Sequence, residues 1–182
     1  VGYLTRDEME ALLGAADRKT WSGQRDYTLL LTLYNSGARV SEITSLKRNQ
    51  IQLGATPFLE LHGKGRKERS VPLWPKTART LKLWLDASPA SSDSPVFPSA
   101  RGAPLSRDGV NYILQEALRA AAERCPSLAG KRISPHLLRH TTAMHLLQSG
   151  VDITVIALWL GHESPETTPI YVEADLKTKE QA

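Results

Sequence analysis

The sequence contains a single cysteine, Cys125, among its 182 residues. One thiol cannot close an intramolecular disulfide or assemble a zinc site by itself, which favours a reducing, intracellular setting. We expect Cys125 to be a small buried or half-buried residue of a helix rather than a reactive thiol. The chain also lacks a signal peptide and an apolar run of the roughly 18 residues that cross a bilayer. No contact with a membrane is therefore expected.

The size and charge of the chain are those of an ordinary globular domain. Its length allows one good hydrophobic core and is short for two domains. Hydrophobic residues make up 41% and charged residues 23% of the sequence, which is typical of soluble proteins. The net charge of +4 and the pI near 9.3 favour a polyanionic partner, but only mildly. Because the first residue is Val1, we expect a fragment or a processed form of a longer protein.

Capping residues, glycine stops and apolar spacing predict most of the helices. Thr5, with a glutamate three positions on, begins the first helix. Ser134 before Pro135 begins another, and Gly37 and Gly161 each end one. Helices are expected at 6–17, 24–36, 41–46, 76–85, 108–124, 135–149, 152–160 and 165–174.

A small sheet is predicted in the first half of the chain. Residues 58–62 and 68–73 have the composition of two strands, joined by a turn at 63–67. The stretch 87–107 is rich in Ser, Pro and Ala and predicts a long, flexible surface loop with a short extended piece at 96–97. No internal repeat is evident. The expected fold class is α+β, mainly α, with a small antiparallel β-sheet.

The segment that begins at His136 is the first candidate for chemistry. His136 and Arg139 lie three positions apart near a helix start, so their side chains share a face. The unpaired N–H groups and the dipole at that end favour an anion such as phosphate. Metal binding by His136 and His140 is an alternative, but the glutamate of the His-Glu-x-x-His pattern is missing. Capping or core histidines are a third possibility. We expect no metal.

Other candidate segments are ambiguous when they are taken one by one. An arginine that follows a helix-ending glycine, as Arg39 does, is usually an exposed residue that Glu42 could pair with. A tyrosine such as Tyr171 near an apolar helix usually belongs to the core. The turn at 63–69 is either a solvated hairpin tip or a nucleic-acid contact. It carries four basic residues, namely Lys64, Arg66, Lys67 and Arg69.

The order of these segments is far more specific than any one of them. Gly-x-Arg-x-Ser-Glu at 37–42 is followed by the lysine-bearing hairpin and by His-x-x-Arg at 136–139. Leu-Gly-His at 160–162 comes next, with a tyrosine nine positions later. In this order and spacing the sequence resembles the tyrosine recombinase (phage integrase) family from Leu4 to about Asp175.

The resemblance implies a DNA breaking–rejoining catalytic domain over residues 1–182, with the family's N-terminal core-binding domain absent from this chain. It implies site-specific cleavage and rejoining of double-stranded DNA through a 3′-phosphotyrosine intermediate, as in the integration of mobile elements, with no cofactor. The catalytic residues that it implies are Arg39, Lys64, His136, Arg139, His162 and Tyr171. Glu42 would support Arg39, and Lys67 is a second choice for the role given to Lys64. The residues expected to contact DNA are Arg66, Lys67, Arg69 and His140.

The segment around the nucleophile departs from the family pattern. Pro169 stands two residues before Tyr171, where it removes a backbone donor and disfavours helix at Thr168. Only eleven residues follow Tyr171, although relatives often dock this tail on a neighbouring protomer. A topoisomerase-like activity would use the same site. A DNA-binding module of a decayed mobile-element protein, without cleavage, is the alternative from another class.

The resemblance also implies the setting. The full-length protein is expected to form a homotetramer on DNA and this fragment a monomer in solution. Its location would be the bacterial cytoplasm, in association with the nucleoid.

Overall fold

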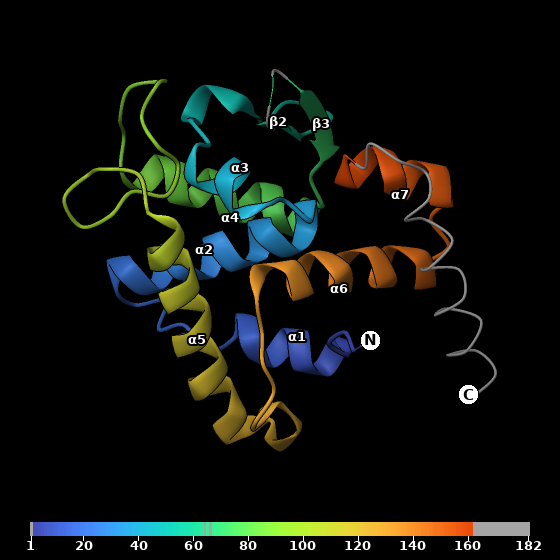
Figure 1. The fold of residues 1–182 in the computed structure, drawn as a ribbon. Helices are drawn as coiled ribbons and strands as arrows, with labels where there is room; N and C mark the ends of the chain where they lie inside the picture. The colour runs from blue at the N-terminus through green and yellow to red at the C-terminus, as the bar shows by residue number, and fades with distance from the viewer. Residues whose placement is uncertain (1, 64, 66, 162–182) are drawn as a thin grey trace.

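A computed structural model describes residues 2–63, 65 and 67–161. Helices dominate this part of the chain, and one three-stranded antiparallel sheet accompanies them (Figure 1). The predicted mainly α class with a small antiparallel sheet is confirmed. The helices are α1 (Arg6–Leu13), α2 (Trp21–Ser36), α3 (Val40–Thr44), α4 (Pro75–Ala87), α5 (Arg107–Arg124), α6 (Pro135–Gln148) and α7 (Ile153–Leu160), with 3-10 turns η1 (Arg48–Gln50) and η3 (Pro126–Leu128). The strands are β1 (Ile51–Gln52), β2 (Phe58–His62) and β3 (Glu68–Pro72).

The predicted caps start the helices, and two boundaries differ from the prediction by more than two residues. Thr5 forms a capping box with Glu8 at the start of α1, and Ser134 caps α6. However, α1 ends at Leu13 rather than near residue 17, with Gly14, a residue of low helix propensity, as its C-cap. Asp17 accepts a hydrogen bond from the Lys19 N–H in the turn that follows. The Thr20 hydroxyl caps α2 by accepting a hydrogen bond from the Gly23 N–H. Helix α2 therefore begins at Trp21 rather than at the predicted residue 24. The predicted helix at 165–174 lies outside the described residues.

The sheet is a meander in the order β1-β2-β3. Strands β2 and β3 have nearly the predicted bounds, and their register pairs Leu59 with Val71 and Leu61 with Arg69. Strand β1 was not predicted. It has only two residues, and Ile51 pairs with Leu59 across the sheet.

The stretch 87–107 is a loop, as expected, but it is fixed to the core rather than being a free surface. The side chains of Val96 and Phe97 are almost completely buried. The Val96 N–H donates to the Leu46 carbonyl at 3.0 Å, and the Val96 carbonyl accepts from the Trp84 indole at 2.7 Å. Cys125 is half-buried, as expected, but it follows the last residue of α5 instead of lying within the helix.

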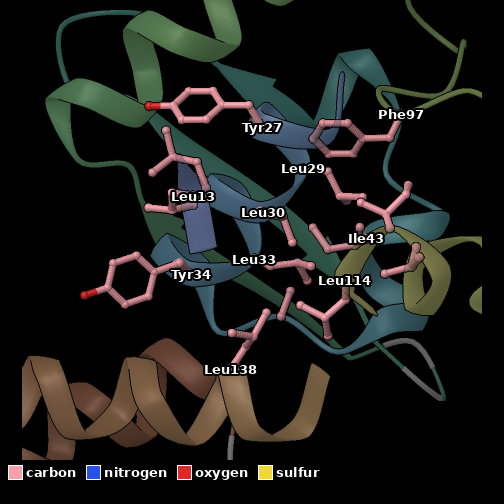
Figure 2. Packing of buried hydrophobic residues seen from close by; sticks show 14 of the residues in the cluster. Leu13, Tyr27, Leu29, Leu30, Leu33, Tyr34, Ile43, Phe97, Leu114 and Leu138 are labelled. Atoms are coloured by element: carbon pink, nitrogen blue, oxygen red, sulfur yellow. The ribbon is translucent and has the colours of Figure 1, made fainter. Parts of the chain in front are cut away.

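Helix α2 forms the centre of the hydrophobic core (Figure 2). Its residues from Tyr27 to Ser36 are all buried, as expected for a helix that is covered on every side. It packs against α4 and α6, while α7 packs against α6 and β3 (Figure 1). The end of α2 is therefore held in a rigid frame beside α6 and α7. Within the described residues, no helix is long and apolar enough to cross a membrane.

Candidate active site

Arg139 joins the ends of two other helices. Its guanidinium donates from Nη1 to the Gly37 carbonyl at 2.6 Å and from Nη2 to the Leu160 carbonyl at 2.5 Å. The Arg139 residue is only 6% exposed. Because the last carbonyl groups of a helix have no partner within it, this guanidinium completes the C-terminal region of both α2 and α7. The predicted phosphate-binding arginine is thus also a fixed part of the fold.

Arg39 lies two residues beyond the carbonyl that Arg139 holds. Gly37 ends α2 in the left-handed conformation, at φ 62° and ψ 23°, and Arg39 is the residue before the first turn of α3. The Arg39 side chain is exposed. Among the described residues, it has no hydrogen-bond or ion-pair partner. The guanidinium is therefore open to an anion from outside the chain.

Glu42 supports the backbone of Arg39 rather than its guanidinium. Oε1 of Glu42 accepts from the Arg39 N–H at 2.8 Å, which also satisfies an unpaired donor at the start of α3. The same carboxylate forms an ion pair with Arg69 and accepts from its Nη2 at 3.1 Å. The Glu42 side chain is fully buried. A catalytic role for Glu42 as the support of Arg39 stays a prediction. The bond from the Arg39 N–H to Glu42 gives that prediction a physical basis.

Arg69, predicted to contact DNA, points toward the interior. Its side chain is 12% exposed, and its Nε donates to the Trp159 carbonyl at 3.0 Å. The signal for this was present in the sequence. Side chains on a strand alternate between two faces, so Arg69 shares a face with Val71, which is fully buried. A DNA contact by Arg69 remains untested, and the observed contacts indicate a different role.

The remaining predicted residues are described in part. His136 is exposed near the start of α6. His140 is half-buried with its ring edge-on to Tyr3 at 5.9 Å, and burial, followed by the charge of His136, lowers the pKa of His140. Lys67 is exposed at the base of the turn, where its carbonyl accepts from the Gly63 N–H at 2.7 Å. Four predicted residues lie outside the described residues: Lys64, Arg66, His162 and Tyr171.

The structure therefore brings the first and third sequence motifs together at the junction of α2, α3, α6 and α7. There Arg139 bonds the backbone two residues before Arg39, and Glu42 accepts from the Arg39 N–H, beside the strands of the lysine-bearing hairpin. Such a junction can stabilise the negative charge of a phosphodiester, since arginines bind phosphate oxygens with geometric specificity. In the part of the chain that the structure describes, no three metal-ligating side chains are grouped.

The mainly helical fold with its small antiparallel sheet is that of tyrosine recombinase catalytic domains. The chain belongs to the phage integrase family, whose profile matches residues 2–177. It is 52% identical over 182 residues to the integrase/recombinase y4rC of Sinorhizobium fredii and 38% identical over 175 residues to the tyrosine recombinase XerC of Pelobacter propionicus. These matches cover 100% and 96% of the chain but only 55% and 56% of the relatives. The crystal structure of XerA recombinase superposes with a TM-score of 0.82 at 27% identity, over 100% of this chain and 65% of that one.

Proposed function

We propose that this chain is the catalytic domain, over residues 1–182, of a site-specific DNA recombinase that cleaves and rejoins double-stranded DNA through Tyr171. The observation that carries the proposal is the bond from Arg139 to the Gly37 carbonyl. It ties Arg139 to the backbone two residues before Arg39, across 102 positions of the sequence, and this supports a phosphate site that both arginines would share. The relatives' names, integrase and tyrosine recombinase, support the same activity.

The proposed reaction is a transesterification. The Tyr171 hydroxyl oxygen attacks the scissile phosphorus, the bond from phosphorus to the 5′ oxygen breaks, and a 3′-phosphotyrosine remains. Arg39 and Arg139 would stabilise the charge on the non-bridging oxygens. A tyrosine hydroxyl has an ordinary pKa near 10, so only about a thousandth is ionised at neutral pH.

Proton transfer is therefore needed at both ends of the reaction. His136 would accept the tyrosine proton, and Lys64 would give a proton to the leaving oxygen. His162 would complete the set around the phosphate. A free 5′ hydroxyl of the same or a second duplex then reverses the step, so the phosphodiester is conserved and neither metal nor nucleotide is consumed.

The proposal extends to the assembly. The chain spans about half the length of the curated relatives that it matches, so a DNA-clamping domain would precede this one in the complete protein. We place that protein on DNA as a homotetramer, in the bacterial cytoplasm and associated with the nucleoid.

The test is a duplex with a nick beside the cleavage site, which releases a short fragment and traps the covalent adduct. The complete protein is expected to form this adduct, and Tyr171→Phe is expected to abolish it while DNA binding persists. Binding of the cognate site without any adduct would instead indicate a DNA-binding module that has lost its chemistry.

A further inference from the structure

Arg69 connects three segments that carry predicted catalytic residues. It extends from β3, in the lysine-bearing hairpin, to Glu42 of α3 and to the Trp159 carbonyl of α7. Glu42 holds the Arg39 N–H with the same oxygen, Oε1, that accepts from Arg69. One buried carboxylate and one guanidinium thus link the hairpin, the Arg39 backbone and the end of α7.

The end of α7 depends on these contacts. This helix is eight residues long and ends at Gly161, which has φ 68° and ψ 36°. Its Trp159 carbonyl is satisfied by Arg69 at 3.0 Å, and its Leu160 carbonyl by Arg139 at 2.5 Å. The two arginines come from different elements, so together they fix the point from which the chain continues to residue 162.

The path of the Arg69 side chain requires a glycine at 161. A Cβ built on Gly161 would lie 2.8 Å from Cδ and 2.9 Å from Nη1 of Arg69, closer than such atoms approach in proteins. The glycine therefore has two functions. It permits the left-handed turn and leaves space for the guanidinium that holds the preceding turn.

Stability alone is a poor explanation for this arrangement. Removing two charges from water costs about as much as their mutual attraction returns, so an apolar pair of similar volume would often serve the fold equally well. An arginine offers something that an apolar side chain does not, namely a rigid fork that binds two acceptors in fixed directions. Here those acceptors belong to two different segments of the candidate site.

We propose that Arg69 is a positioning residue for strand cleavage, which sets the end of α7 relative to Arg39 through Glu42. This inference rests on the proposed function. Arg69 would act on the reaction without touching DNA, and it differs in this from the exposed Lys67 of the same hairpin.

The experiment separates DNA binding from chemistry in the complete protein. Arg69→Lys keeps the charge next to Glu42 but loses the fork. We expect the single-turnover rate of adduct formation at saturating nicked DNA to fall about 10- to 100-fold, because small misplacements of reacting groups have effects of that size. The dissociation constant for DNA and its salt dependence should be unchanged, and the melting temperature should fall by no more than about 5 °C.

Two further variants keep the result interpretable if an unpaired charge damages the fold. Glu42→Gln combined with Arg69→Met removes both charges but keeps an oxygen that can accept from the Arg39 N–H, and it should recover the melting temperature without recovering the rate. Gly161→Ala should lower the rate by displacing Arg69, and its effect should be less than multiplicative with that of Arg69→Lys. Gly102→Ala is the matched control, since Gly102 also has a positive φ of 87° but nothing within 4 Å of an added Cβ.

The outcomes distinguish the alternatives. In the double variant that removes the Arg69 charge, weaker DNA binding, a salt dependence reduced by about one unit and an unchanged rate at saturation would make Arg69 a phosphate contact and overturn the inference. An unchanged rate with unchanged binding would overturn it as well. If the unsubstituted protein forms no adduct, the proposed function fails and this inference fails with it. An adduct that forms equally fast with Arg69→Lys removes this inference alone.

Discussion

Replacing Gly37 by alanine is expected to destabilise the protein by about 2 to 5 kcal/mol. Two separate costs contribute. Gly37 has φ 62° and ψ 23°, and a non-glycine residue in that region costs about 1–2 kcal/mol. A Cβ at this position would also lie 2.3 Å from Cδ2 of Leu160, which is fully buried. Forcing extra volume into a packed site costs about 1–3 kcal/mol more.

Urea or thermal unfolding of the purified variants measures this cost. For a domain of this size, each 1 kcal/mol corresponds to roughly 2–4 °C in melting temperature. Gly102→Ala is the control, because Gly102 has a φ of 87° and open space around an added Cβ. It should lose only the backbone contribution of about 1–2 kcal/mol.

Asparagine separates the two costs further. Asparagine tolerates the left-handed conformation better than alanine does, so Gly102→Asn should recover much of the stability lost in Gly102→Ala. Gly37→Asn should recover little, because its Cβ meets Leu160 in the same way. If Gly37→Ala costs no more than Gly102→Ala, the close packing of α2 against α7 is wrong, and the geometry of the arginine junction is wrong with it.

Three further predictions concern helix α6 and the residue before α3. Burial lowers the pKa of His145 below its ordinary 6.5. The unfolded state therefore binds a proton more readily, and the free energy of unfolding decreases as pH falls below about 6.5. His145→Gln should flatten this pH dependence in urea unfolding between pH 5 and 8, and an unchanged slope would contradict the prediction. Arg139→Lys should lower the free energy of unfolding by about 1–3 kcal/mol, because a lysine cannot serve the Gly37 and Leu160 carbonyls together; an unchanged melting temperature would refute this. Arg39→Ala should change the free energy of unfolding by less than about 0.5 kcal/mol and reduce the rate of adduct formation by a factor of roughly 100 or more. A near-normal rate of adduct formation would remove Arg39 from the site.

Local chemistry made much of the fold predictable. The Thr5–Glu8 capping box, the Ser134 cap and the left-handed Gly37 and Gly161 are each set by residues within a few positions of one another. Strand β1 was missed because two residues cannot show an alternating pattern, and its pairing with Leu59 depends on the rest of the sheet. The composition of 87–107 predicts a flexible loop because it says nothing about the distant Trp84 and Leu46 groups that hold this loop.

The membership of the candidate site stays a prediction, and the sequence did not predict the contacts that its described residues make. Helical spacing predicts that His136 and Arg139 share one face near a helix start that favours an anion. The structure leaves His136 exposed and buries Arg139 against carbonyls that are 102 and 21 residues away in the sequence. No local pattern predicts such partners. For Arg69, by contrast, the alternation with Val71 was available and would have indicated its inward direction.

Arg39 and Arg139 therefore differ in when the entropy cost of ordering their side chains arises, although the family pattern gives both as catalytic residues. Ordering an arginine side chain costs up to about 2 kcal/mol of conformational entropy. For Arg139 this cost is met when the protein folds, since its guanidinium already joins α2 and α7. For the exposed Arg39 it must be met when phosphate binds. Substitutions at Arg139 consequently mix a loss of structure with a loss of chemistry, whereas substitutions at Arg39 report on phosphate binding and chemistry without a loss of structure. Arg39 is thus the residue at which the proposed phosphate clamp can be judged without reference to folding.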